Sequence, residues 1–342
     1  MSVPFLRMLR GKRSGVWLAG LALMLGLSGC GQSAPGHAGA TDASGRSSAS
    51  SAVPASAASP SDTANAGKKT VKHIWGETPI QGVPKKVVAL DFYIVDTLVS
   101  LGVQPAGIAG SGDTRVPAYI KDQAGTFTDV GERKEPNLEV IRSLDPDLII
   151  ANPERAKMIQ GELEKIAPTI ALSDRSYQTI LDNVDLLADV FEKPDQAKKV
   201  RADLESKIKQ AKEKIGKSSS VLVVGVFEDE MSVWVKNSFV ASLMTDIGLN
   251  YVFDGAKEKT EGNADIATIT VERLAEYNPD LLFLYGDSIA KLKANPLFKQ
   301  LKAAKENHVY EVDRDLWARS RGPIAAGLIV DEAAALLNGQ GK

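Results

Sequence analysis

A short pattern occurs twice in this chain, once at residues 136–150 and again at residues 269–283. In each copy a residue suited to a helix N-cap, Asn137 or Thr270, opens a short helical stretch. A Pro-Asp pair then ends the helix, and an apolar run typical of a buried strand follows. Helix and strand units in this order build α/β folds, so one copy in each half of the chain indicates two similar lobes.

Short apolar runs alternate with helical patterns along the rest of the chain, as expected for lobes with largely parallel sheets. A helix is expected over residues 92–101, after the first strand. The segment from Asp195 to Lys214 lacks Gly and Pro and has a helical apolar stripe, which predicts one connecting helix. The fold class is therefore α/β, with two Rossmann-like lobes, mainly parallel sheets and a single long helix between them. The runs expected to form strands are 86–90, 148–151, 221–227, 231–235, 281–285 and 309–312.

The N-terminus resembles a bacterial targeting signal. Basic residues precede an apolar stretch from Val16 to Leu27, which is too short to span a bilayer comfortably. The stretch ends in Leu-Ser-Gly-Cys, which resembles a lipobox, the signal in which the cysteine is lipidated. Cys30 is the only cysteine, so an internal disulfide and a cysteine metal cluster are excluded. An ordinary cleaved signal with an incidental cysteine is the alternative.

The segment from Gly31 to about Lys69 consists largely of Ser, Ala, Gly, Thr and Pro. Such a composition cannot bury enough apolar surface to offset its ordering entropy, which predicts a flexible tether with a reach of roughly 35 Å. A net charge of −2 without a large basic block argues against nucleic acid as a partner. The expected parts are a signal peptide (1–29), the lipidated cysteine and tether (30–70), an N-terminal lobe (71–193), a connecting helix (194–216) and a C-terminal lobe (217–342).

Three arginines, Arg314, Arg319 and Arg321, lie in one short segment near the C-terminus. Guanidinium groups present a rigid fork of donors that matches carboxylates, and they repel one another unless an anion is present. If the segment is extended, Arg319 and Arg321 point to the same face, and Gly322-Pro323 ends the run with a turn. The set predicts a site for a ligand with several carboxylates, and a solvated basic loop is the alternative.

Motifs of common enzyme classes are absent from the sequence. It has no P-loop, no Gly-rich dinucleotide fingerprint, no Gly-x-Ser-x-Gly and no His-Glu-x-x-His. The histidines, His37, His73 and His308, are scattered, so direct chelation of a bare metal ion is not expected. The pattern favours a binding protein over an enzyme, and any metal would arrive inside its chelator.

Five motifs taken in order carry a resemblance to a known family. The chain resembles the ABC-transporter solute-binding lipoproteins of the siderophore and vitamin B12 class, whose two lobes are joined by one helix. It is most similar to the iron-siderophore group of Gram-positive bacteria, including binders of ferric citrate and of citrate-based siderophores. The motifs are 130–139, 144–151, 165–170, 246–248 and 312–322.

The resemblance implies a ligand cleft between the lobes, a ferric siderophore as ligand and no cofactor of the protein's own. It also implies an ABC permease and its ATPase as partners, a monomer, and a lipid anchor at the outer face of the cytoplasmic membrane. A hydroxamate siderophore, haem or cobalamin is the alternative ligand on the same fold. A lipid-anchored adhesin without a small ligand is a further alternative.

The same resemblance implies which arginines face the cleft. Arg133, in a Gly-x-Arg-Lys motif, would face it from the N-terminal lobe, and Arg314, Arg319 and Arg321 would face it from the other lobe. Arg115 is a further candidate in the N-terminal lobe. The alternative for Arg133 is a turn residue packed on a neighbouring glutamate.

Two aromatic and two acidic residues complete the expected site. Trp234 and Trp317 either pack against the ligand or belong to the core. Glu139 and Glu272, in the first turns of the repeated helices, match family positions that project toward arginines of the permease. Their alternative role is stabilisation of the helix dipole, worth about 0.3–1 kcal/mol each.

Overall fold

The computed structural model describes residues 67–216, 218–255 and 265–339. The expected signal peptide, Cys30 and most of the expected tether lie outside the described residues. Strand β1 (Lys68–His73) begins within the last residues assigned to the tether and pairs with β2 (Gly76–Gln81) in an antiparallel two-stranded sheet. Thr78 in β2 donates its hydroxyl to the Thr169 carbonyl, which attaches this small sheet to the first lobe.

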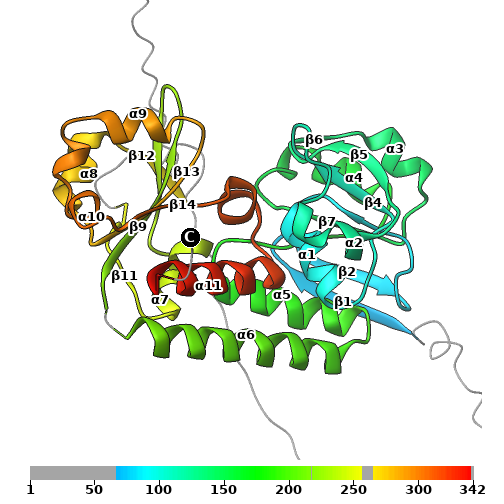
Figure 1. Cartoon of the computed structure of the whole chain (residues 1–342). Coiled ribbons are helices and arrows are strands. Elements are labelled where there is room, and N and C mark those ends of the chain that lie inside the picture. Colours follow the sequence, from blue (N-terminus) through cyan, green and yellow to red (C-terminus); the bar gives the residue numbers. More distant parts are fainter. Residues whose placement is uncertain (1–66, 217, 256–264, 340–342) are drawn as a thin grey trace, which may run out of the picture. The chain divides into compact units, whose positions relative to one another are not determined.

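The first lobe, here called the N-lobe (Figure 1), contains a six-stranded sheet. Its strand order is β6-β5-β4-β3-β7-β8. All neighbouring strands are parallel except the terminal pair, β5 and β6. Strands β3, β4, β7 and β8 are buried along their whole length, as expected for a sheet with helices on both faces. The strands are β3 (Val87–Ala89), β4 (Gly107–Gly110), β5 (Thr128–Glu132), β6 (Glu135–Pro136), β7 (Leu148–Ala151) and β8 (Thr169–Ala171).

Short helices follow the strands of the N-lobe. The longest is α5, whose N-cap Ser176 accepts a hydrogen bond from the Thr179 amide. The helices are α1 (Phe92–Ser100), η1 (Ala118–Ile120), α2 (Lys121–Ala124), α3 (Leu138–Ser143), η2 (Lys157–Ile159), α4 (Gln160–Glu164) and α5 (Tyr177–Val190).

The second lobe, here called the C-lobe, has a sheet in the order β12-β10-β9-β13-β14, and β11 also pairs with β9. β9, β11, β13 and β14 run parallel, whereas β10 is antiparallel to both of its neighbours. The strands are β9 (Ser220–Val226), β10 (Met231–Trp234), β11 (Asn250–Tyr251), β12 (Ile266–Thr268), β13 (Leu281–Tyr285) and β14 (Val309–Glu311). The helices are α7 (Phe239–Asp246), α8 (Val271–Tyr277), α9 (Ile289–Ala294), η3 (Phe298–Gln300), α10 (Lys302–Lys305) and η4 (Asp315–Arg319).

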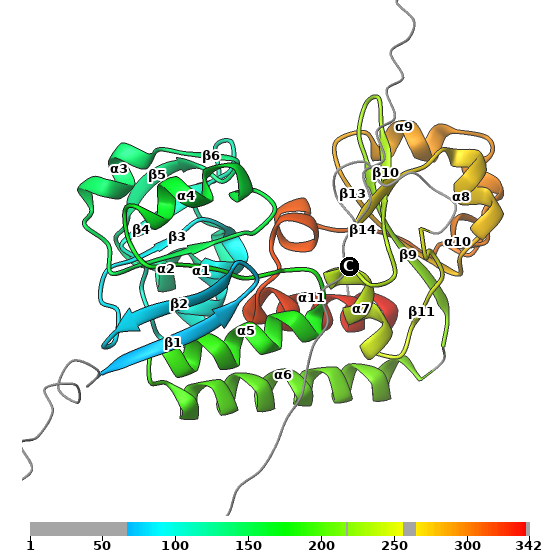
Figure 2. The ribbon, with the colours of Figure 1, turned by 180° about the vertical axis from the view of Figure 1, so that it is seen from behind.

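Helix α6 (Pro194–Ile215) joins the two lobes, where one connecting helix was predicted. Proline in its first turn favours helix initiation, and Gly216, with φ of 64°, ends it in the left-handed region. Helix α11 (Pro323–Leu337) runs alongside α6 and α5 in both views (Figures 1 and 2). It packs on α6, α1, α5 and α7, so the last helix of the chain contacts elements of both lobes.

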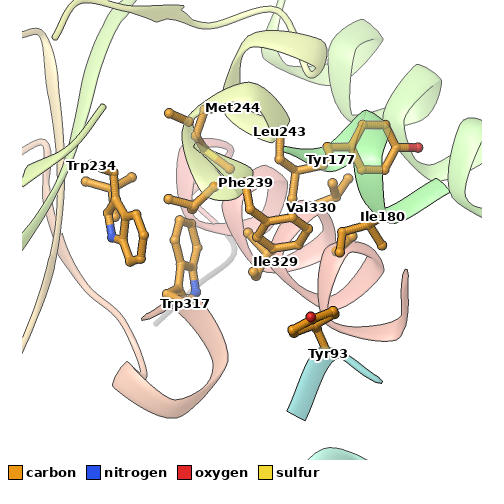
Figure 3. Close-up of a cluster of buried hydrophobic side chains, with 14 of the residues drawn as sticks. Tyr93, Tyr177, Ile180, Trp234, Phe239, Leu243, Met244, Trp317, Ile329 and Val330 are labelled. Carbon is orange, nitrogen blue, oxygen red and sulfur yellow. The ribbon is translucent and has the colours of Figure 1, made fainter. Parts of the chain in front are cut away.

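A buried cluster of large side chains continues from one lobe into the other (Figure 3). It includes Tyr93 of α1 and Ile180 of α5 from the N-lobe, and Trp234 and Phe239 from the C-lobe. Ile329 of α11 also belongs to this cluster. The α/β fold with two parallel-rich lobes is therefore confirmed, and its core is shared across the lobe boundary.

The repeated sequence pattern has equivalent structures in the two lobes. Asp147 accepts hydrogen bonds from the amides of Lys85 and Lys86, at the start of β3. Asp280 accepts from the amide of Ser220, at the start of β9. The aspartate of each Pro-Asp pair thus fixes the beginning of the neighbouring parallel strand. Hydrogen bonds and nearby lysines lower the pKa of both carboxyls, that of Asp280 to about 2.

Candidate functional site

A buried carboxylate holds two arginines in the N-lobe. Asp91 follows β3, caps α1 by accepting from the Phe92 amide, and leaves 2% of its side chain exposed. Arg133 Nη1 donates to Asp91 Oδ1 over 2.8 Å, and Arg155 Nη1 donates to Asp91 Oδ2 over 2.6 Å. The Arg133 guanidinium also lies 4.3 Å from the centre of the Phe92 ring. Because Asp91 follows β3, the two arginines that it binds lie at the carboxyl end of a parallel strand, where α/β sheets bind ligands.

The electrostatics of this group leave it with a net positive charge. Burial by itself would raise the pKa of Asp91, but the charges of Arg155 and Arg133 hold that pKa below its usual value. Asp91 correspondingly raises the pKa of Arg155. Two guanidinium groups therefore share one ionised carboxylate. The Nε of Arg133 is buried without a hydrogen-bond partner among the described residues, so the group has more donors than acceptors.

Arg155 is a member of this group that the sequence analysis missed. It follows β7 closely, and β7 is the strand next to β3 in the sheet. A signal was available, because a charged residue soon after a buried parallel strand lies at the ligand-binding edge of such a sheet.

The C-terminal arginine segment is helical as far as Arg319, so the condition of an extended segment, under which Arg319 and Arg321 would share a face, is not met. Asp313 accepts from the Leu316 amide with its side chain and from the Trp317 amide with its carbonyl, and these bonds start the π-helical turn η4. Arg319 consequently reaches Asp315, one turn earlier, over 2.8 Å. Arg319 and Arg321 therefore do not share the face of an extended strand.

Arg314 is the exposed arginine of the segment. Its guanidinium lies 4.4 Å from the centre of the Phe227 ring. Within the described part of the chain it has no carboxylate within ion-pair distance, so its charge is available to a ligand.

Arg321 is buried and spans the lobe boundary. Its side chain donates to Asp174 of the N-lobe over 2.9 Å and to Asp265 of the C-lobe over 3.2 Å. The Trp234 ring lies below the guanidinium, 4.8 Å away. The charges of Asp174 and Asp265 also contribute to the raised pKa of Arg155, so the structure brings Arg321 toward the N-lobe arginine pair.

Arg115 is held by its own lobe. It donates to Glu132 over 2.8 Å and to Asp129 over 3.4 Å, and it also contacts the Gly112 carbonyl. The hydrogen bond with Glu132 is the main cause of the raised pKa of Arg115. Its charge is largely matched by these two carboxylates.

The two candidate tryptophans, Trp234 and Trp317, lie in the core (Figure 3). Trp317 is 1% exposed, stacks on Phe283 at 4.7 Å between ring centres, and donates its Nε1 hydrogen to Glu332. Trp234 is 2% exposed. These positions favour the core role over direct contact with a ligand.

Glu139 and Glu272 are both exposed and lie in the first turns of α3 and α8. Asn137 caps α3 and Thr270 caps α8, as the repeat predicted. A hydrogen bond from the Thr270 side chain lowers the pKa of Glu272. Each lobe therefore presents one acidic side chain at an equivalent position.

A groove of about 460 Å³ lies between α6 and α11 and is lined by Lys207, Lys214 and Asp331, among others. Within residues 67–216, 218–255 and 265–339, no cluster of His, Cys, Asp and Glu could hold a metal ion. No described helix combines the length and the apolar character needed to cross a membrane.

Two parallel-rich lobes joined by one connecting helix define the fold class of the bilobal binding proteins. The chain belongs to the periplasmic binding protein family, which matches residues 87–316. The resemblance drawn from the five sequence motifs is thereby confirmed.

Individual relatives agree with this assignment. YhfQ of Bacillus subtilis (strain 168), which carries the name of an ABC transporter substrate-binding lipoprotein, is 34% identical and the match covers 78% of this chain and 87% of YhfQ. The Fe(3+)-citrate-binding protein YfmC of the same organism is also 34% identical, over 72% of this chain and 79% of YfmC. The structure of Staphylococcus aureus SirA complexed with staphyloferrin B is similar, with a TM-score of 0.71 and 26% identity. That similarity covers 79% of this chain and 98% of SirA.

Proposed function

We propose that this chain is the substrate-binding protein of an ABC importer and captures an anionic ferric chelate of the citrate type. The observation that carries the proposal is the arginine pair at Asp91, where two partly buried guanidinium groups share a single buried carboxylate. Two relatives support this class of substrate. YfmC is named as an Fe(3+)-citrate-binding protein, and the SirA structure contains staphyloferrin B. The relatives are binding proteins, which supports a binding role and not an enzymatic one.

Arginines on both lobes would hold the chelate. Arg133 and Arg155 would bind its carboxylates from the N-lobe, and Arg314 and Arg319 would bind from the C-lobe. Arg115 is less favoured as a contact for the chelate, because two carboxylates already match its charge. Charge-assisted bonds of this kind orient the ligand and speed its capture, while desolvation offsets part of the Coulomb energy.

Delivery to the membrane is also part of the proposal. Glu139 and Glu272 would each pair with arginines of the permease, one from each lobe, and the ATPase would drive transport. A lipid on Cys30 would anchor the monomer at the outer face of the cytoplasmic membrane. The lipoprotein name of YhfQ supports this location.

A ligand titration tests the proposed substrate. Tryptophan fluorescence of the mature chain should respond saturably to ferric citrate or a ferric carboxylate siderophore. Haem, cobalamin and a ferric hydroxamate should bind more weakly, because they present fewer carboxylates to the arginines. Saturable binding of haem or cobalamin, with no response to any ferric chelate, would refute the proposal.

Paired substitutions link that binding to the cleft. Arg314→Ala removes an arginine with no carboxylate partner among the described residues, so it should cost about 1.5–3 kcal/mol of binding, or roughly tenfold or more in Kd. Arg201→Ala is the matched control, because Arg201 lies on α6 and pairs with Asp185. Equal affinity of both variants would place Arg314 outside the site.

A further inference from the structure

We infer that Arg321 is a positioning residue, which fixes the two lobes relative to each other. Its guanidinium is bound by one carboxylate from each lobe, Asp174 and Asp265. This role does not depend on which chelate the protein binds.

The cluster is buried, so its charges interact strongly. The side chains of Arg321, Asp265 and Asp174 are 9%, 10% and 14% exposed. Burial is the main cause of the raised pKa of Asp265, and the nearby Asp174 raises it further. Arg175 also approaches Asp265, at 3.5 Å, but is itself largely exposed. Arg321 is therefore a buried cation that forms an ion pair with both carboxylates, and the charge of Arg155 also interacts with both.

The two carboxylates come from different parts of the fold. Asp174 lies between β8 and α5 in the N-lobe, and Asp265 directly precedes β12 in the C-lobe. Without Arg321 they would repel each other across the lobe boundary, in a medium that screens charge poorly. Removal of the Arg321 guanidinium would therefore leave a repulsion between the two carboxylates that pushes the lobes apart.

A second contact holds the same segment against the N-lobe. Asp96 of α1 accepts from the amides of Ile324 and Ala325, at the start of α11. Gly322 lies so close to Asp96 that an added Cβ would fall 2.1 Å from the Asp96 Cγ. The backbone next to Arg321 is therefore fixed in place, and the two ion pairs of its side chain have little freedom to rearrange.

This arrangement distinguishes Arg321 from the other arginines of the segment. Among the described residues, Arg314 has no carboxylate partner, and Arg319 pairs only with Asp315 on its own turn. A ligand anion could use Arg321 only by competing with Asp174 or Asp265.

The distance between the lobes, measured without ligand, tests the inference. Spin labels would be placed with Met158→Cys in the N-lobe and Lys299→Cys in the C-lobe, both at exposed positions, in a Cys30→Ser background. Pulsed EPR of the parent should give a narrow distance distribution. Arg321→Gln should widen it and shift it to longer distances, and Arg321→Lys should restore part of the parent distribution.

Two further variants keep the test decisive. Asp174→Asn removes the N-lobe partner alone and should also widen the distribution, so it serves if Arg321→Gln does not fold. Asp185→Asn removes a carboxylate from the exposed Arg201 pair and should leave the distribution unchanged. An unchanged distribution in folded Arg321→Gln or Asp174→Asn would overturn the inference. Because no chelate is present, this result is separate from the outcome of the ligand titration.

Discussion

Asp96 is a fully buried carboxyl group that receives three hydrogen bonds. The donors are the Tyr119 hydroxyl and the amides of Ile324 and Ala325. Burial raises the pKa of Asp96 from 3.8 to about 6, although these three donors act in the opposite direction. The folded protein therefore binds the Asp96 proton more tightly than the unfolded chain does.

The first prediction concerns the pH dependence of stability. Because the folded pKa is raised, the contribution of Asp96 is fully present below about pH 4 and is lost as pH rises through about 6. A shift of about two units corresponds to roughly 3 kcal/mol. Asp96→Asn does not titrate, so the stability of the parent relative to this variant should fall between pH 4.5 and 7. Denaturant unfolding at several pH values measures the free energy of unfolding of both proteins. A parent that becomes more stable relative to Asp96→Asn as the pH rises would contradict the prediction.

At this scale the sequence indicates the arginines but not their partners. The C-terminal arginines are conspicuous because arginines close together repel one another, and Arg133 is indicated by the resemblance of its Gly-x-Arg-Lys motif. Asp91, Asp174 and Asp265 lie far from them in sequence, and only the folded chain brings the charges together. Pairing of this kind decides which arginine charge is free, and a single sequence contains no periodic signal for it.

At the level of elements, the start of α11 depends on a glycine. Gly322 has φ of −100°, which any residue can adopt, so backbone strain does not explain the choice. The lack of space explains the glycine, because a Cβ at this position would collide with the Asp96 carboxyl. The glycine allows α11 to approach α1 closely enough for Asp96 to cap it.

Gly322→Ala should therefore destabilise the protein by about 1–3 kcal/mol, the usual cost of overpacking a filled site. Gly161→Ala in α4 is the matched control, since an added Cβ there meets nothing within 4 Å. That control should be neutral or stabilising by up to about 1 kcal/mol, because alanine favours helices over glycine. Urea unfolding of the two variants measures both effects, and equal stabilities would show that Asp96 can move aside.

Elements with a clear hydrophobic pattern were predictable. The apolar runs at 148–151 and 281–285 form β7 and β13, and the helical stripe after residue 194 forms α6. The turn η4 was not predictable, because it depends on hydrogen bonds to Asp313 and on the burial of Trp317 against Phe283. The pair β1 and β2 was also missed, since its strands are mostly exposed and polar.

At the scale of the whole molecule, docking to the permease should need both lobes. Glu139→Ala and Glu272→Ala should leave ligand affinity and melting temperature nearly unchanged, because both side chains are exposed. Uptake of labelled iron by cells should fall in each variant and most in the double variant, since two contacts fix orientation better than one.

The control for docking is Glu205→Ala, which removes an exposed glutamate from α6 and should not affect uptake. A role limited to the helix dipole gives the reverse pattern, with slightly lower melting temperatures and normal uptake. Normal uptake in the double variant would therefore exclude the docking role.

The contact between Asp96 and α11 also restricts the order in which the chain can fold. The amides that Asp96 caps are 228 and 229 positions later in the sequence. The N-lobe sheet is built from residues that precede α6, but the face of α1 that receives α11 stays uncovered until the end of the chain arrives. Contacts across so long a separation form late, because the loop entropy must be overcome first. A chain made from its N-terminus therefore completes its first lobe only when almost all of the second has been synthesised.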